Sequence, residues 1–324
     1  MSSNKGLKIK LILSNNLFLF LVFLKYEFIS EEWTKYIYNP VLGNNKTGTV
    51  FDPFVIKYNN IYIMYVSWRT FGAIALSTSK DGIKWSNLKI ILDKGNKQSW
   101  ESIVNRACII IFNNKFYLWY TGQQKGKSKI GLAISENGSE FIRYINNPIL
   151  IPENDFEKNS VMNPYVIYDN EEKIFKMWYA AGEFYEPDVI CYATSKNGIS
   201  WIKYKNNPIF SKNTKIFSLD SFKVGGCEVH KISNRKYIMF YIGYSDINTA
   251  RIFIAKSPNG INNWKRSGIP IIKPTKGQFD SDACYKPSVI FDKTKKIWML
   301  WYNGRRKNVE LIGYAYHKLV HLFN

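Results

Sequence analysis

One pattern occurs five times along this chain of 324 residues. Each copy contains an apolar strand that begins at a polar residue, an aromatic strand that ends in Trp-Tyr or a similar pair, and a third strand. The repeat length of about 54 to 64 residues suits one blade of a β-propeller, which buries both faces only by stacking against its neighbours. The sequence therefore predicts an all-β fold, a five-bladed β-propeller of four-stranded antiparallel blades.

The third strands are the clearest copies. They begin at Ile74, Ile130, Ile190, Ile252 and Ile312, and the first four are closed by Asp81-Gly82, Asn137-Gly138, Asn197-Gly198 and Asn259-Gly260. These dipeptides accept the positive φ angles of a type I′ turn, so we expect a hairpin with the strand that follows. The fifth copy lacks this hairpin. Segment 33–42 resembles the blade-ending segments 143–150 and 203–210, and we expect it to complete the fifth blade and lock the ring.

The propeller is expected to form one domain over residues 33–324, preceded by an N-terminal extension, residues 1–32, to which no role is assigned. The apolar run 17–24 follows several lysines but ends without a small-residue cleavage site, and it is too short to span a bilayer. We therefore expect an extra element packed on the propeller and a cytoplasmic location, with export through an atypical signal as the alternative.

The cysteines and the charge limit the classes of function. The four cysteines, Cys108, Cys191, Cys227 and Cys284, have no metal-like spacing and are expected to be buried thiols of a reducing compartment. The formal net charge of +20 comes from lysines scattered through turns, not from one basic stripe, so we expect no nucleic-acid partner. A preference for acidic or phosphorylated sugars remains, and we expect a monomer.

Each inner strand of a propeller contributes residues to the axial cavity where the strand begins. Aligning the repeats places Asp52, Arg106, Asn163, the Cys227-Glu228 pair and Lys286 at this mouth. Further candidates for substrate binding are Asn105, His230, Tyr285, Glu101 and Asp282, with Trp68, Arg69 and Arg305 as walls at the rim. Proline follows three of the mouth residues and holds each of them extended, which fixes the direction of the side chain. Convergent polar groups of this kind indicate catalysis or the binding of a polar ligand.

Two segments resemble a known group of proteins. The start of blade one, Phe51-Asp52-Pro53-Phe54-Val55, and the start of blade four, Gly225-Gly226-Cys227-Glu228-Val229-His230, resemble the five-bladed propeller glycosidases. The similarity is above all to glycoside hydrolase family 43, with relatives in families 32, 62, 68 and 130. Together with the repeat, it covers roughly Trp33 to Tyr316.

The family-43 pattern implies three roles. By this resemblance, Asp52 is the general base and Glu228 the general acid, and Asn163 stands where the family has an orienting Asp. An amide can position a neighbouring group but supplies no negative charge to keep a carboxylic acid protonated. The acid then needs another source of a raised pKa, such as burial or Glu101.

Three functions remain open. The first is an inverting glycoside hydrolase that uses Asp52 and Glu228 on opposite faces of the sugar. The second is a propeller phosphorylase or glycosyltransferase, in which Arg106, His230 and Lys286 supply an anion site for a phosphorylated or acidic sugar. The third is a non-catalytic carbohydrate-binding propeller. No dinucleotide-binding, Walker or Cys/His metal motif is present in the sequence, so we expect no cofactor and no metal.

Overall fold

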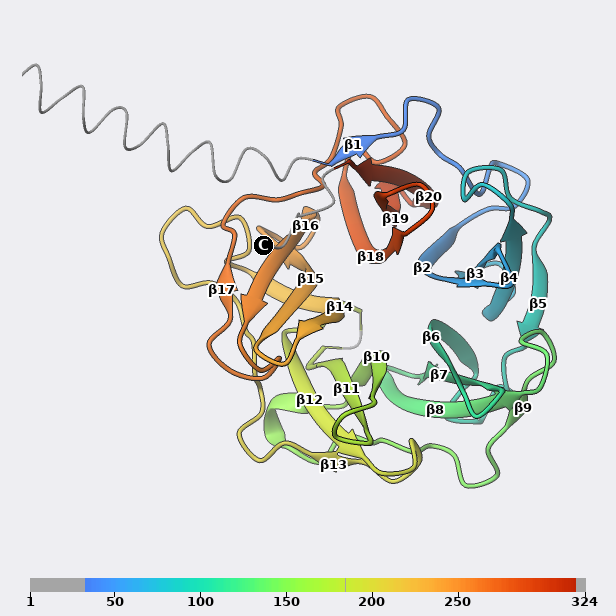
Figure 1. Cartoon of the computed structure of the whole chain (residues 1–324), viewed down its shortest axis with the longest axis vertical. Helices are drawn as coiled ribbons and strands as arrows, with labels where there is room; N and C mark the ends of the chain where they lie inside the picture. Colours follow the sequence, from blue (N-terminus) through green and yellow to red (C-terminus); the bar gives the residue numbers. More distant parts are fainter. Residues whose placement is uncertain (1–32, 184, 319–324) are drawn as a thin grey trace, which may run out of the picture.

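Five four-stranded antiparallel sheets surround a common axis in the computed structural model, which describes residues 33–183 and 185–318 (Figure 1). The inner strands are β2 (Val50–Tyr58), β6 (Ile103–Phe112), β10 (Val161–Asp169), β14 (Lys223–Ser233) and β18 (Ala283–Asp292). The second strands are β3 (Ile61–Trp68), β7 (Lys115–Gln124), β11 (Ile174–Ala181), β15 (Lys236–Tyr244) and β19 (Ile297–Arg306). The predicted five-bladed propeller is confirmed.

The outer half of each blade completes the sheets. The third strands are β4 (Ala73–Ser79), β8 (Lys127–Ser135), β12 (Val189–Ser195), β16 (Ala250–Ser257) and β20 (Val309–His317). The outermost strands are β5 (Lys89–Leu92), β9 (Ile142–Arg143), β13 (Ile202–Lys203), β17 (Lys265–Arg266) and β1 (Thr34–Lys35). One short 3₁₀ helix, η1 (Asp155–Glu157), precedes β10. No helix within the described ranges is long and apolar enough to cross a membrane. The expectations for residues 1–32 lie outside these ranges.

The chain closes its ring with an N-terminal strand. Strand β1 pairs antiparallel with β20, and Leu42 forms a further bridge to Ile312. Trp33, just before β1, is only 3% exposed and packs in the core with residues of blades four and five. Segment 33–42 therefore completes the fifth blade, as the sequence predicts.

Aromatic side chains of the second strands connect four of the five blades to a turn in the next one. Four such bonds run from Tyr65 to Gly138, from Trp119 to Gly198, from Trp178 to Gly260 and from Trp301 to Gly82, with the glycine carbonyl as the acceptor each time. These rings are almost completely buried, so the bonds lie in a low-dielectric core. The tryptophans of the repeated Trp-Tyr pairs thus make inter-blade contacts.

The Asn-Gly and Asp-Gly turns are not type I′ turns, and this prediction is wrong. In the first of them, Gly82 has φ of 82°, whereas Asp81 does not have a positive φ. The Asp81 side chain instead accepts hydrogen bonds from the backbone N–H groups of Ile83 and Lys84, both at 2.8 Å. Such side-chain bonds replace the tight turn with a longer loop, while the predicted antiparallel pairing still holds.

Every inner strand contains a β-bulge at the same level. Pairing with the second strand shifts register there in all five blades. The residues with positive φ are Asp52 (52°), Arg106 (58°), Asn163 (52°), Gly226 (45°) and Lys286 (39°). Four of these are not glycine, so the surrounding structure must hold a costly backbone conformation, which is typical of functional sites. Asp52, Asn163 and Lys286 precede proline, and the prediction that proline holds them extended is wrong. In blade four the residue at this bulge position is Gly226, so the prediction that the Cys227-Glu228 pair occupies it is wrong.

Candidate functional site

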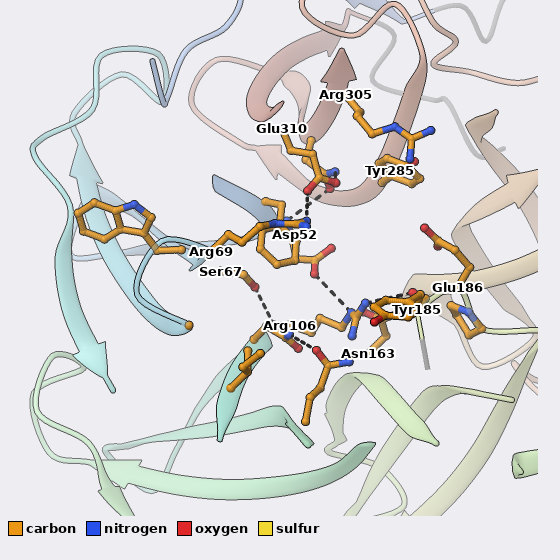
Figure 2. Close-up of a pocket in the computed structure, with 18 of the residues that line it drawn as sticks. Asp52, Ser67, Arg69, Arg106, Asn163, Tyr185, Glu186, Tyr285, Arg305 and Glu310 are labelled. Atoms are coloured by element: carbon orange, nitrogen blue, oxygen red, sulfur yellow. Dashed lines mark hydrogen bonds and ion pairs between the residues drawn. The ribbon is translucent and has the colours of Figure 1, made fainter. Parts of the chain in front are cut away.

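A cavity of about 610 Å³ lies at the start of the inner strands and is lined by residues of all five blades (Figure 2). Eight of the predicted site residues line it: Asp52, Trp68, Arg69, Asn105, Arg106, Asn163, Tyr285 and Arg305. The bulges explain part of this convergence, since three of these residues occupy equivalent bulge positions on neighbouring strands. The structure therefore brings together most of the mouth that the sequence predicts.

Asp52 contributes a buried carboxyl group to the cavity. It is 7% exposed, and its Oδ2 lies 3.5 Å from Nε of Arg106. Burial raises the pKa of Asp52, although Arg106, Lys286 and Arg69 act in the opposite direction. Because burial outweighs these cations, Asp52 holds a proton more readily than an exposed aspartate does.

Arg106 connects blade one, blade two and a loop of blade three. Its backbone N–H donates to Oγ of Ser67 at 2.9 Å, which helps to fix the bulge. Its Nη2 donates to the carbonyl oxygen of Tyr185 at 3.4 Å (Figure 2). Its Nη1 is buried and has no hydrogen-bond partner within the described residues. The guanidinium is therefore positioned on two sides and keeps one donor unused.

Glu186 is a cavity residue that the sequence analysis missed. It lies on the loop between β11 and β12 and accepts a hydrogen bond from the hydroxyl of Tyr244. Burial raises its pKa, and the Tyr244 bond and the Arg106 charge act against this. The loop lies outside the aligned strands, but Glu186 precedes Pro187. The same residue-before-proline signal that singles out Asp52 could have identified it.

Glu310 on β20 is a second carboxyl group that the sequence analysis missed. It is 8% exposed, forms an ion pair with Arg69 and accepts a hydrogen bond from Nδ2 of Asn303 at 3.3 Å. Burial raises its pKa to about 7 despite Arg69, and the charges of Asp52 and Glu186 add to this rise. Nothing in the local sequence distinguishes it from other strand residues. Three carboxyl groups with raised pKa values thus share one cavity.

Buried polar atoms without a hydrogen-bond partner are concentrated at this cavity. Within the described residues, they include Oδ2 of Asp52, Oδ1 of Asn105, Nη1 of Arg106, Oδ1 of Asn163, the hydroxyl of Tyr285 and Nε of Arg305. An unsatisfied buried polar atom costs roughly 1–3 kcal/mol, so proteins keep such groups where a ligand can supply the partner. This clustering indicates a site for a polar ligand.

Glu228 and His230 lie elsewhere, and the expectation that Glu228 shares a cavity with Asp52 is wrong. Both line a second cavity of about 840 Å³, formed by later residues of the inner strands such as Ile56 and Ile110. The Glu228 carboxylate accepts bonds from Nε2 of His230 at 2.7 Å and from the N–H of Val289 at 3.0 Å. Its place two residues beyond the bulge explains the separation.

Glu101 has a structural position that recurs around the ring. It is buried, accepts a hydrogen bond from the hydroxyl of Tyr120 at 2.6 Å and pairs with Nε of Arg143 at 2.9 Å. The same triad of tyrosine, acid and outer-strand cation occurs as Tyr179–Glu157–Lys203, Tyr241–Asp220–Arg266 and Tyr302–Asp280–Lys35. The predicted role of Glu101 in substrate binding is not supported, because its carboxylate holds blade two together.

Lys286 and Asp282 lie near the cavity without lining it. Lys286 is 1% exposed, and its positive charge acts on Asp52, Cys108 and Cys227. Asp282 accepts a bond from the N–H of Lys307 at 2.5 Å, and so fixes the turn between β19 and β20.

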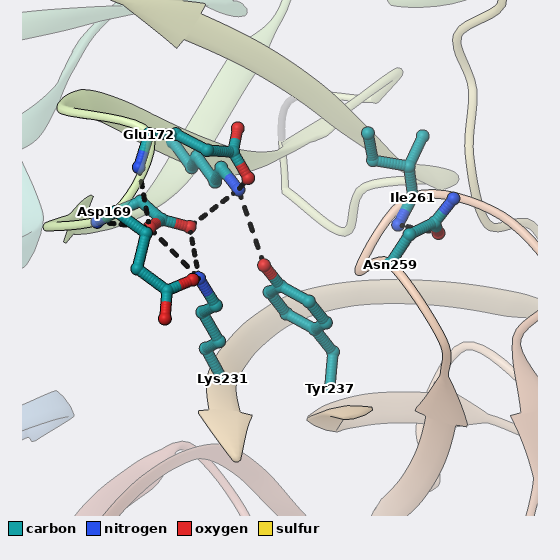
Figure 3. Close-up of polar contacts among 8 residues, drawn as sticks. Asp169, Glu172, Lys231, Tyr237, Asn259 and Ile261 are labelled. Atoms are coloured by element: carbon teal, nitrogen blue, oxygen red, sulfur yellow. Dashed lines mark hydrogen bonds and ion pairs between the residues drawn. The ribbon is translucent and has the colours of Figure 1, made fainter. Parts of the chain in front are cut away.

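A polar network joins blades three and four close to the second cavity (Figure 3). Asp169 accepts hydrogen bonds from Nζ of Lys176 at 2.8 Å and Nζ of Lys231 at 2.9 Å, and Lys176 also bonds the hydroxyl of Tyr237. Burial opposes ionisation of Asp169, but the two lysines hold its pKa below the ordinary value. These charges are mutually compensated, so the network is a structural link between blades.

The four cysteines are free and buried, which confirms the prediction of unpaired thiols. Burial raises the pKa of each thiol. None of them lines the candidate site.

Comparison with known proteins identifies the family of this chain. The sequence profile of the glycosyl hydrolases family 32 N-terminal domain matches residues 22–104 and 75–222, which together make up more than half of the chain. The chain belongs to this family. Family 32 is among the relatives named from the sequence, so the predicted relation to the five-bladed propeller glycosidases is confirmed.

Individual relatives of this family-32 propeller include both hydrolases and phosphorylases. The chain is 27% identical over 235 residues to the 1,2-β-oligomannan phosphorylase of Thermoanaerobacter sp. strain X514, covering 69% of this chain and 71% of that protein. Among solved structures, a glycoside hydrolase aligns with a TM-score of 0.71 and 20% identity, over 88% of this chain and 93% of that one. The β-1,2-mannobiose phosphorylase of Listeria innocua aligns with a TM-score of 0.68 and 14% identity, over 90% and 98%. At these identities the structural matches establish the fold alone.

Proposed function

We propose that this family-32 propeller cleaves a glycosidic bond by phosphorolysis at the cavity around Asp52. The observation that carries the proposal is the combination, in one cavity, of a half-buried carboxyl group with a raised pKa, Glu186, and a guanidinium, Arg106, that keeps a buried donor unused. A proton donor and an anion-binding group are the two functions that phosphorolysis requires. The 1,2-β-oligomannan phosphorylase relative supports this choice over hydrolysis.

In the proposed reaction, protonated Glu186 gives its proton to the glycosidic oxygen. A phosphate oxygen then forms a bond to the anomeric carbon as the bond to the leaving sugar breaks, and the products are a glycosyl phosphate and a shortened glycan. Arg106 binds the phosphate because a guanidinium fits phosphate oxygens in pairs. Asp52 orients Arg106 through its ion pair. Burial raises the pKa of Glu186 above that of an exposed glutamate, which suits a general acid.

Phosphate dependence tests this proposal. Purified protein is incubated with 1,2-linked β-mannooligosaccharides and a panel of other oligosaccharides, with and without inorganic phosphate, and sugar phosphates are measured. We expect sugar phosphate only with phosphate present, a loss of about 10²–10⁴-fold in Glu186→Gln, and a KM for phosphate raised at least about 10-fold in Arg106→Gln. Glu183→Gln is the matched control, since Glu183 lies on the same loop, pairs with Lys223 and does not line the cavity. Equal turnover in Glu186→Gln and Glu183→Gln would contradict the assignment.

Hydrolysis is the second candidate, and a different observation favours it. Asp52 and Glu186 are two carboxyl groups contributed by blade one and by the blade-three loop to the same cavity. A pair of this kind can act as base and acid on opposite faces of a sugar, with water as the nucleophile. Release of free sugar in phosphate-free buffer would select this reaction.

A further inference from the structure

The charges that line the cavity do not balance. Cationic side chains are Arg69, Lys125, Arg106, Arg305 and Lys307, whereas the carboxyl groups are Asp52, Glu186 and Glu310. The cations therefore exceed the carboxyl groups by two even when all three are ionised. Arg69 is paired with Glu310 and Arg106 with Asp52, which leaves Lys125, Arg305 and Lys307 with Glu186 as the one remaining carboxyl group of the lining.

Two of the uncompensated cations are neighbours on blade five. Arg305 lies at the end of β19, and Lys307 lies in the turn that follows. Asp282 anchors both, because its backbone N–H donates to the carbonyl of Arg305 at 2.9 Å and its carboxylate accepts from the N–H of Lys307 at 2.5 Å. The carboxylate of Asp282 thus bonds the backbone of this turn and attracts Arg305 at longer range, but within the described residues neither Arg305 nor Lys307 forms a side-chain ion pair.

The Arg305 guanidinium is held in place but is incompletely bonded. Its Nη2 donates to the carbonyl of Asn248, and its Cζ lies 5.4 Å from the ring centre of Tyr285. Its Nε is buried without a partner in the part of the chain that the structure describes, and the same is true of the Tyr285 hydroxyl. Figure 2 shows the two side chains next to each other at the blade-five wall, across the cavity from Arg106. An anchored cation and a hydroxyl donor with unused hydrogen-bonding capacity together fit an anionic oxygen.

We propose that the substrate is an anionic glycan, and that Arg305, Tyr285 and Lys307 bind a carboxylate or phosphate carried by the sugar that lies against blade five. This inference rests on the proposed function, because it assigns the substrate class of the same site. It separates two anion positions: the attacking phosphate at Arg106 and the charged group of the glycan at Arg305.

A glycan array with a matched pair of variants tests the proposal. The array contains neutral oligosaccharides beside uronic-acid-bearing and phosphate-bearing ones, and binding is read for the unmodified protein, Arg305→Gln and Arg306→Gln. Arg306 is the control, since it lies on the same turn with the same charge, is exposed, and does not line the cavity. We expect the retained glycans to be anionic, retention to fall at least about 10-fold in Arg305→Gln, and Arg306→Gln to bind normally. The carboxylate and phosphate arms identify which group is bound.

The outcomes also separate this inference from the proposed reaction. Retention of neutral glycans as strong as that of anionic ones, retention of no glycan, or equal binding by the two variants would refute the anionic substrate. Phosphate-dependent cleavage of neutral glycans alone would refute it as well, while supporting phosphorolysis. Binding of anionic glycans that depends on Arg305 without any turnover would support the inference and refute the reaction.

Discussion

Replacing Glu310 with glutamine is expected to stabilise the protein, and more strongly as the pH rises. In the folded protein, burial raises the pKa of Glu310 to about 7, from 4.5 in an exposed glutamate. Between these two pH values the folded state binds more protons than the unfolded state, so the free energy of unfolding falls as the pH rises. Above about pH 7 the buried carboxyl group destabilises the folded protein to its full extent, because the group is then charged in both the folded and the unfolded state. We call this loss of free energy the penalty.

The size of the penalty follows from the two pKa values. One pH unit corresponds to about 1.4 kcal/mol, so the full difference amounts to about 3 kcal/mol. Between about pH 5 and about pH 7.5 this destabilisation grows by about 2 kcal/mol. The attraction between Arg69 and the ionised carboxylate is already included in the pKa of Glu310, and a cost of losing the Asn303 bond that does not depend on pH cancels when the two pH values are compared.

This difference in the free energy of unfolding can be measured by urea denaturation. The unmodified protein and Glu310→Gln are each compared at about pH 5 and about pH 7.5. We expect the stability of the variant relative to the unmodified protein to increase by about 2 kcal/mol from the lower to the higher pH. A relative stability that does not change with pH would show that the carboxyl group titrates normally. The idea that the cavity holds a carboxyl group at a cost in stability would then be wrong.

Two further predictions concern the other acids. Glu157→Gln removes the charge of a fully buried triad residue bonded by Tyr179 and Lys203, and urea denaturation should show a free energy of unfolding lower by about 3 kcal/mol. The control Glu172→Gln, at a half-exposed partner of Lys176, should change it by less than about 1 kcal/mol. Similar losses in the two variants would contradict the structural role of the triads. Glu228→Gln should keep near-normal turnover in the phosphorolysis assay because Glu228 lies in the second cavity. Asp52→Asn should lower the turnover at least about 10-fold, because Arg106 is then oriented less well. A folded Glu228→Gln protein without activity would support the acid role that the family resemblance implies.

The sequence by itself determined the architecture. Five copies of one strand pattern cannot bury their faces singly, so they must stack in a ring, and the N-terminal segment 33–42 repeats the blade-ending pattern closely enough to reveal how the ring closes. The residues at the start of the inner strands could also be predicted, since Asp52, Arg106 and Asn163 share one place in the repeat. These features are local in the sequence or strictly periodic.

Only the tertiary structure determined which acidic residues line the same cavity. A β-bulge shifts the register of each inner strand by a residue, and in blade four this assigns Gly226 to the mouth and Glu228 to the second cavity. Glu186 reaches the site from a loop outside the repeat, and Glu310 reaches it from a third strand. Their raised pKa values come from burial among side chains that are distant in the chain. Burial and register depend on the packing of all five blades, so no single repeat contains them.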